Sequence, residues 1–463
     1  MDRSTVRSAA AVAAGGAMLL WPAFFSGYPL VFSDTASFLE QTSAAAASPV
    51  WDKPVVYGPL LHAFHWRWSV WPAAAAQALL LSWLLRLAVR MVRGRAAVDG
   101  AHLLLVAALC AGTAAPWFAS FIMPDALAPA LVLAVALLGW GEPRPAERAG
   151  LLLVVALAAA SHLAHLPLLF ALLLALAAAR RWRAARDGAA ALAAALLLVV
   201  ATNAAFQGRA AVSPYGAVFA VARLAADGPV ARTVEARCPE AGWHLCRWAG
   251  RLPTDSDEFL WSSDGPAWAD RLDGAVPGGP IGFAPEAGVV LRETLAREPL
   301  GVLRAAAANT VRQLIAVRTG DTLGPDHLAA SVALQLALDF PAAEGARLAA
   351  SLQFRGLLRD AAAPFLLPHL PVLLAGAVAL PFAAWRARLR GDAPLLGLLL
   401  CIVVGVLANA AVLGALSGPH DRYGARIAWL VPLGALLAWR RHGSRAGIAA
   451  PPGPAWPGEA AAR

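Results

Sequence analysis

Long runs of apolar residues dominate this sequence of 463 residues and exclude most soluble folds. Each run approaches the roughly 20 residues that a helix needs to cross the hydrocarbon core of a membrane. Only 14% of the residues are charged and the mean hydropathy is +0.60, whereas soluble proteins carry about 25% charged residues. We therefore expect an all-α polytopic membrane protein with about ten transmembrane helices, at residues 8–30, 69–90, 99–119, 125–141, 149–162, 164–179, 188–207, 362–385, 394–416 and 424–440.

Arginine-rich connections alternate with connections that hold few basic residues. Arginines gather before the first run and after the second, fourth, sixth, eighth and tenth runs. Basic residues in short loops mark the cytoplasmic side of a membrane protein. The alternation predicts ten spans with both termini in the cytoplasm, and two separate spans at 149–162 and 164–179. The first run resembles a signal peptide in part, but its length and the lack of a small-residue cleavage site favour an uncleaved helix.

The net charge of +9 does not indicate a nucleic-acid partner. Residues 208–361 hold 15 arginines and 17 acidic residues, and the rest of the chain holds 23 basic and 12 acidic residues. Most of the basic excess therefore lies in the short loops between apolar runs. The sequence contains no basic stripe with interleaved aromatic residues, so we expect no nucleic acid among its partners.

The apolar runs and the charge pattern divide the chain into four regions. These are an N-terminal transmembrane module at 1–207 with its first outer loop at 31–68, an extracytoplasmic segment at 208–361, C-terminal transmembrane helices at 362–442 and a cytoplasmic tail at 443–463. The tail is rich in Pro, Gly and Ala, which predicts disorder.

The segment 208–361 is too polar to span a membrane and too long for a plain loop. Residues 251–285 are rich in Pro, Gly and Asp and predict irregular structure, whereas 286–318 and 328–359 predict amphipathic helices, the first broken at Pro299. Such helices either lie along the membrane surface or form a small domain packed on the spans. The sequence leaves open whether Cys238 and Cys246 form a disulfide or are free thiols.

Several ionisable residues fall on the predicted outer face, next to the ends of apolar runs. Asp34 follows the first run, Asp125 begins the fourth and Arg422 precedes the last. Each of them alone is typical of a helix cap or a turn. Their shared face instead suggests a reaction or a transport path there. The same face holds further polar candidates, namely Asp52, Lys53, His162, His165, His420 and Tyr423.

Other chemistry-bearing motifs give little support to alternative enzyme classes. His162 and His165 are three residues apart, a spacing compatible with a metal pair, but histidines buried in the core or at the interface are commoner. The chain contains no Gly-x-x-x-x-Gly-Lys and no His-Glu-x-x-His motif, so ATP-driven transport and zinc-dependent proteolysis have no support.

These positions resemble the GT-C superfamily of membrane glycosyltransferases, which includes protein O-mannosyltransferases and the aminoarabinose transferase of lipid A. The family has an acid early in the first outer loop, then a basic residue, a proline and an aromatic residue before the second span. The matching features are Asp34, the stretch Thr35–Ala47, Asp52-Lys53-Pro54-Val55-Val56-Tyr57, Pro124-Asp125-Ala126-Leu127, Arg297-Glu298-Pro299-Leu300 and Arg422-Tyr423.

The resemblance implies a bacterial inner-membrane enzyme that moves a sugar from a polyprenyl-phosphate donor to a glycan, lipid or protein of the cell envelope, with inversion. It implies Asp34 as general base, with Asp125 orienting the acceptor or a histidine. Arg422 would bind the donor phosphate, supported by His420, Tyr423 or Lys53. His162, His165 and Asp52 would give polar support.

The chain departs from the family in one respect, because Asp34 has no adjacent acid in the sequence. A lone carboxylate is a poor site for a divalent cation such as Mg²⁺ or Mn²⁺. The resemblance leaves such an ion open, and we expect a base that works without a metal.

Two other classes use the same residues differently. A lipid or glycolipid transporter, or a flippase, needs paired ionisable groups along a path through the membrane. The apolar runs hold few such groups, among them His102 near an inner end and the neutral Asn203 and Asn409. A non-catalytic scaffold of envelope assembly would instead keep working after Asp34 and Arg422 are replaced.

Overall fold

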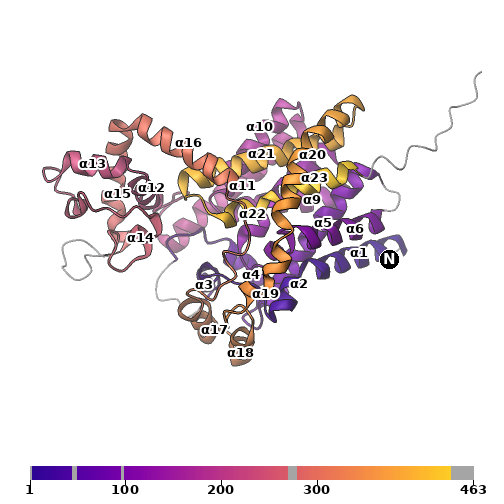
Figure 1. Ribbon diagram of the computed structural model, residues 1–463, viewed down its shortest axis with the longest axis horizontal. Helices are drawn as coiled ribbons and strands as arrows, with labels where there is room; N and C mark the ends of the chain where they lie inside the picture. The colour runs from indigo at the N-terminus through magenta and orange to yellow at the C-terminus, as the bar shows by residue number, and fades with distance from the viewer. Residues whose placement is uncertain (1–2, 44–49, 95–97, 269–278, 440–463) are drawn as a thin grey trace, which may run out of the picture.

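The computed structural model describes residues 3–43, 50–94, 98–268 and 279–439, and this part of the chain is almost entirely helical (Figure 1). Its only β-type contact is an isolated bridge between Leu30 and Phe121. The prediction of an all-helical protein is confirmed for these residues. The predicted disorder of 443–463 concerns residues outside this part of the chain.

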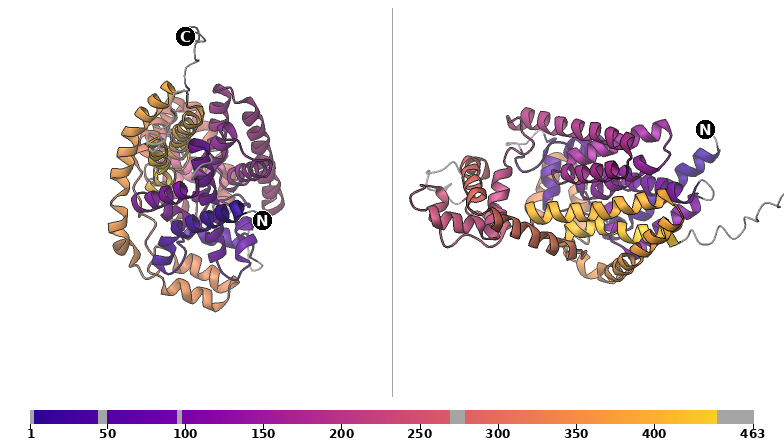
Figure 2. Two further views of the ribbon diagram at one scale, coloured as in Figure 1. Left: turned by 90° about the vertical axis from the view of Figure 1, so that its right-hand side faces the viewer. Right: turned by 90° about the horizontal axis from the view of Figure 1, so that it is seen from above.

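A body of long, roughly aligned helices makes up most of the molecule (Figures 1 and 2). Each of the ten apolar runs coincides with one helix or with two consecutive helices, and 149–162 and 164–179 form separate helices. The helices of the body are α1 (Arg3–Leu19), α2 (Trp21–Ser26), α5 (Trp71–Arg93), α6 (Val98–Gly112), α7 (Ala115–Ala119), α8 (Leu127–Trp140), α9 (Pro145–Ser161), α10 (His165–Ala178), α11 (Trp182–Gln207), α19 (Leu358–Leu366), α20 (His369–Leu389), α21 (Ala393–Leu416), α22 (Asp421–Ala428) and α23 (Leu430–Trp439).

Four segments of the described chain are long and apolar enough to cross a membrane. They are Trp71–Arg93, Trp182–Gln207, Leu358–Leu389 and Ala393–Leu416, and the other apolar helices are shorter or broken. The structure is therefore compatible with a membrane protein through these four segments.

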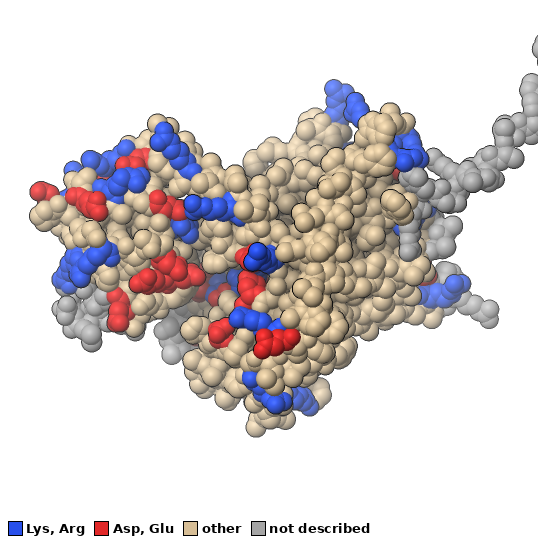
Figure 3. Space-filling view, in the orientation of Figure 1, with Lys and Arg blue, Asp and Glu red and all other residues tan. Residues whose placement is uncertain are grey.

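Charge is unevenly distributed along the body (Figure 3). The side of the body that faces the viewer is largely free of charged side chains, and basic side chains gather at the end where the N-terminus and the end of α23 lie (Figures 1 and 3). The opposite end carries the first outer loop and most of the segment 208–361. This arrangement agrees with the arginine alternation of the sequence.

The segment 208–361 divides into three parts. Its first part is a small helical domain, here called the outer domain, which has an apolar core of its own around Phe259 and Phe283. It contains α12 (Gly216–Ala226), α13 (Pro229–Arg237), the 3₁₀ helix η2 (His244–Trp248), α14 (Ser256–Trp261) and α15 (Pro280–Arg297). The expectation of irregular structure over 251–285 is wrong where α14 and the start of α15 lie, because Phe259 and Phe283 supply apolar anchors there.

The second and third parts pack on the body. The predicted break at Pro299 is confirmed, and α16 (Pro299–Ile315) leaves the outer domain and runs along α21. The π-helical turn η4 (Ala329–Ala333) and α17 (Leu334–Asp339) lie against α3 (Ser33–Glu40), which packs on α4 (Tyr57–His65), and α18 (Ala342–Ala350) packs on η4 and α17. The segment therefore agrees with the alternative of helical structure packed on the spans, and a location along the membrane surface stays a prediction.

A buried carboxylate fastens α18 to the body. Glu344 is 1% exposed, and its Oε1 accepts hydrogen bonds from the Tyr28 hydroxyl at 2.9 Å, the Ser69 hydroxyl at 3.1 Å and the Val70 amide at 2.9 Å. Buried carboxylates persist when several donors replace the water that they lose. Glu344 thereby joins the end of the first apolar run and the start of the second to the outer segment.

Cys238 and Cys246 of the outer domain form a disulfide, which resolves the alternative left open by the sequence. Disulfides persist in oxidising compartments, so this pair supports an extracytoplasmic outer domain. Cys110 and Cys401 are free and lie in α6 and α21.

We expect denatured protein from an oxidising host to take up two thiol-reactive mass tags before reduction and four after it, because only Cys110 and Cys401 are free. Gel shifts with a maleimide-polyethylene glycol reagent measure the number of tags. Expression in a host that lacks its periplasmic thiol oxidase serves as the control and should give four tags without reduction. Four tags without reduction from the oxidising host would contradict the extracytoplasmic placement.

Candidate functional site

The site begins where the first and fourth apolar runs meet. The amide of Leu30 donates to the carbonyl of Ser120 at 2.9 Å, and the amide of Ile122 donates to the carbonyl of Leu30 at 2.8 Å. The Thr35 hydroxyl donates to the carbonyl of Ile122 at 3.0 Å. These bonds hold the first turn of α3, which carries Asp34, beside the chain that enters α8.

Lys53 comes to Asp34 from the far end of the first outer loop. Its ammonium lies 3.3 Å from Oδ1 of Asp34, also bonds the carboxylate of Asp52, and lies 5.7 Å from the centre of the Phe38 ring. The side-chain amide of Gln207, at the end of α11, donates to the carbonyl of Lys53 at 3.5 Å. Lys53 therefore reaches Asp34 from a loop that the body holds in place.

The first turn of α22 is fixed by the end of α16 and the loop after it. The amide of His420 donates to the side chain of Gln313 at 2.9 Å, and Gln313 donates back to the carbonyl of His420 at 2.9 Å. The amide of Arg422 donates to the carboxylate of Asp321 at 3.1 Å. A Cβ at Gly424 would come within 2.0 Å of the backbone oxygen at the end of α16, so glycine is required for this close approach.

Arg422 joins the two predicted acids into one cluster. Its guanidinium lies 3.9 Å from Oδ2 of Asp34 through Nη2 and 3.9 Å from Oδ1 of Asp125 through Nε. Arg426, one turn further along α22, lies 3.5 Å from Oδ1 of Asp125. Its guanidinium also donates to the side-chain oxygen of Asn409 on α21, at 3.0 Å from Nη2. The three residues that the sequence places on one face thus belong to one cluster of charged side chains, in which Arg422 lies between the two acids.

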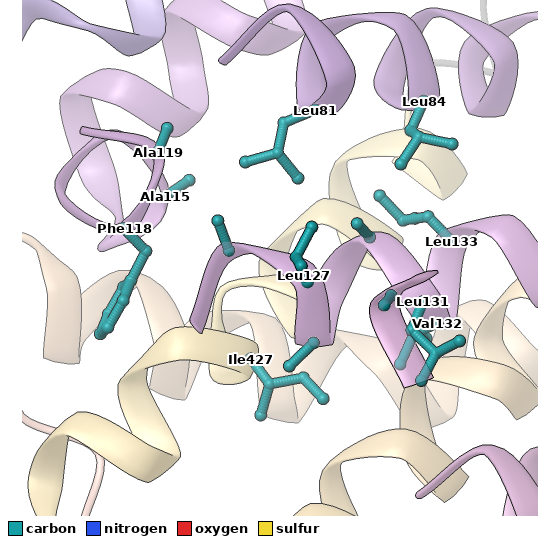
Figure 4. Close-up of a cluster of buried hydrophobic side chains, with 14 of the residues drawn as sticks. Leu81, Leu84, Ala115, Phe118, Ala119, Leu127, Leu131, Val132, Leu133 and Ile427 are labelled. Atoms are coloured by element: carbon teal, nitrogen blue, oxygen red, sulfur yellow. The ribbon is translucent and has the colours of Figure 1, made fainter. Parts of the chain in front are cut away.

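The cluster becomes more buried from Asp34 towards Arg426. The Asp34 side chain is 32% exposed, Arg422 is 9% exposed and Arg426 is 0% exposed. Leu127 and Ile427, which follow Asp125 and Arg426 closely in sequence, belong to one cluster of buried apolar side chains (Figure 4). The inner end of the site therefore adjoins the dry core of the body, and Asp34 lies at its mouth.

Aromatic rings flank the guanidinium groups. The Arg422 guanidinium lies 4.6 Å from the centre of the Phe32 ring and 5.0 Å from that of Tyr423. Arg426 lies 5.6 Å from the Tyr423 ring. Stacking of this kind orients a guanidinium while leaving its edge nitrogens available. Nη1 of Arg422 is buried and makes no hydrogen bond to the described residues, so this donor is unused.

The charges around Asp34 set its protonation state. Burial alone would raise the pKa of Asp34. The positive charges of Lys53 and Arg422 lower it by a larger amount, so the resulting pKa lies below the ordinary value of a carboxyl group. Asp34 and Asp52 in turn raise the pKa of Lys53 against the effect of burial. Asp34 is therefore a carboxylate and Lys53 an ammonium at neutral pH.

The predicted histidines lie at different depths around the cluster. His162 is partly exposed just after α9, and its ring centre lies 5.0 Å from that of His165. His165 is buried and its Nδ1 lies 2.8 Å from the carbonyl of Ala158, which indicates a packing role at the end of α9.

His420 and Tyr423 lie beside Arg422 at the start of α22. His420 is exposed, and its ring centre lies 5.3 Å from that of Tyr423. The Tyr423 hydroxyl accepts a hydrogen bond from Ser417 at 3.2 Å.

Two features of the site add to the expectation. Asp125 pairs with Arg422 and Arg426, and its expected role of orienting an acceptor or a histidine stays a prediction. Asp34 also has a carboxylate partner in space, Asp52, although none stands beside it in the sequence, because the loop returns Asp52 to the same ammonium.

The residues present do not fit a divalent cation. Lys53 lies between the carboxylates of Asp34 and Asp52, and Arg422 faces Asp34 from another side. A metal ion between these acids would therefore meet the repulsion of two cationic side chains. In the described part of the chain, no group of three or more His, Cys, Asp and Glu side chains is placed to hold a metal ion.

Arg426 and Asn409 are site residues that we did not predict as such. Arg426 falls inside the last apolar run, and its spacing of one helical turn from Arg422 places both on one face of α22. Asn409 is a polar residue inside an apolar run, which is a signal for an interhelical partner. Phe32 gave no sequence signal, because its stacking on Arg422 depends on the bend before α3.

We expect Asp125→Asn to destabilise the protein strongly, because it leaves Arg422 and Arg426 buried with less compensating charge. Breaking a buried ion pair costs about 3–5 kcal/mol, which corresponds to a lower temperature of unfolding in detergent. Asp326→Asn is the matched control, because Asp326 also lies 3.9 Å from an arginine, Arg359, but is 71% exposed. Exposed pairs contribute about 0–1 kcal/mol. Equal shifts for the two variants would contradict the burial argument.

Comparison with known proteins assigns no family to this chain. No protein-family model, no curated protein and no solved structure matches it. The resemblance to GT-C glycosyltransferases thus stays a prediction from the quoted residues.

Proposed function

We propose that this protein is an inverting membrane glycosyltransferase of the GT-C type, with ten spans and an extracytoplasmic active site. The observation that carries the proposal is the convergence of Asp34, Lys53, Asp125 and Arg422 at one end of the helical body, from three separate parts of the chain. The donor would be a sugar linked to polyprenyl phosphate, and the acceptor a hydroxyl compound of the cell envelope.

The reaction needs a base at the acceptor and positive charge at the leaving group. Asp34 takes the proton of the acceptor hydroxyl while the hydroxyl oxygen forms a bond with the anomeric carbon of the donor. The bond between that carbon and the phosphate oxygen breaks, and its electron pair leaves with polyprenyl phosphate. The proton passes from Asp34 to solvent, which Asp34 contacts through its exposed edge.

Arg422 is the residue best placed to receive the phosphate. It has a buried, unused Nη1 donor, and two aromatic rings fix its plane. Guanidinium groups bind phosphate oxygens with charge-assisted hydrogen bonds. Arg426 and Asp125 hold Arg422 from the inner side and would act as positioning residues. The lipid tail would lie along the apolar outside of the body.

We expect Asp34→Asn to lower the rate of sugar transfer by at least about 100-fold, the usual contribution of a general base. Full-length protein in lipid vesicles is tested with a panel of radiolabelled polyprenyl-phosphate sugars and an extract of envelope acceptors. Glu40→Gln, on the same helix, is the control for local structure. Normal insertion with full transfer activity in Asp34→Asn would exclude Asp34 as the base and leave a transporter or a scaffold as the better interpretation.

We expect Lys53→Met to move the acid limb of the rate profile to higher pH. Lys53 lowers the pKa of Asp34 in the native protein, so its removal lets Asp34 take up a proton at a higher pH than before. The maximal rate at saturating donor is measured between about pH 4 and pH 8, which brackets the ordinary carboxyl value. Lys53→Arg keeps the charge and should restore the native profile. An unchanged acid limb in Lys53→Met would show that the limb belongs to another group.

A further inference from the structure

Aromatic side chains gather where the outer domain meets the first outer loop. Trp51 stacks on Phe219 of α12 with ring centres 5.3 Å apart and lies 5.6 Å from the ring of Trp261 on α14. Phe219 and Trp261 meet edge to face at 6.4 Å. Residues far apart in sequence therefore build one aromatic surface, here called the aromatic platform and defined by Trp51, Phe219 and Trp261.

The platform has a face open to solvent and a carboxylate beside it. Trp261 is 48% exposed, although its neighbours Phe259 and Leu260 are buried in the core of the outer domain. Asp257 is exposed and stands four residues before Trp261 on α14, so the two side chains share one face of the helix. The contacts with Trp51 and Phe219 account for part of the Trp261 ring, and the rest of the side chain stays open to solvent.

The platform adjoins the candidate site. Trp51 stands two residues before Lys53, whose ammonium contacts Asp34. The side-chain amide of Gln207 donates to the carbonyl of Val50 at 3.0 Å and to that of Lys53 at 3.5 Å, and so holds this short stretch of chain. Trp51 of the platform and Lys53, which contacts Asp34, therefore belong to one stretch of three consecutive residues that Gln207 holds in place.

Asp257 belongs to the part of the outer domain near the candidate site. The charges of His420, Asp34 and Arg422 act on it together with that of its neighbour Asp255. His420 and Arg422 come from the start of α22, and Asp34 comes from α3. Charged side chains also gather along the junction between the outer domain and the body (Figure 3). The Trp261 ring lies 5.6 Å from that of Trp51, two residues before the Lys53 that contacts Asp34, so Trp261 and Asp257 lie on the side of the outer domain that borders the mouth.

We propose that Trp261 and Asp257 form the acceptor subsite and that the acceptor is a carbohydrate, namely a sugar chain whose terminal residue lies on the Trp261 ring. This inference rests on the proposed function. A sugar ring has an apolar C–H face, which packs on an indole, and an edge of hydroxyl groups, which donate to a carboxylate. An aromatic ring beside a single acid fits this combination, whereas an apolar lipid anchor needs no carboxylate.

The experiment measures acceptor recognition separately from donor chemistry. Full-length protein is titrated by calorimetry with neutral trisaccharides, namely α-mannotriose, cellotriose and β-1,4-galactotriose. We expect one of them to bind and its affinity to fall about tenfold in Trp261→Ala, the scale of a lost aromatic contact, and to fall also in Asp257→Asn. Trp261→Phe keeps a ring and should retain most of the affinity. Trp68→Ala, a control at a tryptophan that is 71% exposed elsewhere on the molecule, should change nothing.

A kinetic readout distinguishes this proposal from the proposed function. Trp261→Ala should raise KM for the acceptor about tenfold, while slow hydrolysis of the donor by water stays unchanged. If transfer occurs but Trp261→Ala and Asp257→Asn alter neither trisaccharide affinity nor acceptor KM, the subsite is overturned and the glycosyltransferase proposal stands. If no donor supports transfer but the variants lose trisaccharide affinity, carbohydrate binding stands and the proposed activity fails. Unfolding temperatures equal to the native protein exclude misfolding as the cause.

Discussion

The ion pairing of Asp125 with Arg422 and Arg426 is the constraint on which the outer end of this protein depends. Three charged side chains at the border of a dry helical core are stable only if they compensate one another. Their pairing fixes α22 against the start of α8, and Asn409 of α21 adds the hydrogen bonds that the pair leaves open. Burying any one of these charges without its partners would cost free energy. The helix ends that carry the charges therefore stay in the relative position that keeps them paired. The more exposed Asp34 and Lys53 then meet an arginine that is already oriented.

The outer segment makes this arrangement rigid from the other side. Gln313 and Asp321 bind the first turn of α22, and Glu344 ties α18 to the loops around the first and second apolar runs. Gln353 adds a reciprocal pair of hydrogen bonds with the backbone of Val31, three residues before Asp34. A segment that sequence reasoning treats as an insertion between spans therefore supports both halves of the site. The position of Asp34 depends on residues more than 300 positions away.

Several features were predictable from the sequence, because apolar length, proline and loop charge act locally. They are the helical class, the separation of 149–162 from 164–179, the break at Pro299 and the shared face of Asp34, Asp125 and Arg422. The residues that pair with these charged side chains were not predictable from the sequence. Asp52 becomes a neighbour of Asp34 only after the first loop folds back, and Arg426 enters the site only when α22 packs on α8. The short helix α14 was missed because its turn-forming composition was outweighed by Phe259 and Leu260, which anchor it in the outer domain. Tertiary burial overrides local propensity at such positions.

Charge balance connects the resting site to the proposed reaction. The carboxylates of Asp34, Asp52 and Asp125 are matched by the cations of Lys53, Arg422 and Arg426, so the group is neutral before any ligand enters. Under the proposed function, a donor phosphate that binds Arg422 competes with Asp34 for the same guanidinium. Asp34 then loses part of the positive field that lowers its pKa, and it becomes a stronger base when the donor is in place. Lys53 stays paired with Asp34 and limits this rise, which keeps the carboxylate ionised. The same arginine would thus bind the leaving group and adjust the base, a coupling that neither residue achieves without the other.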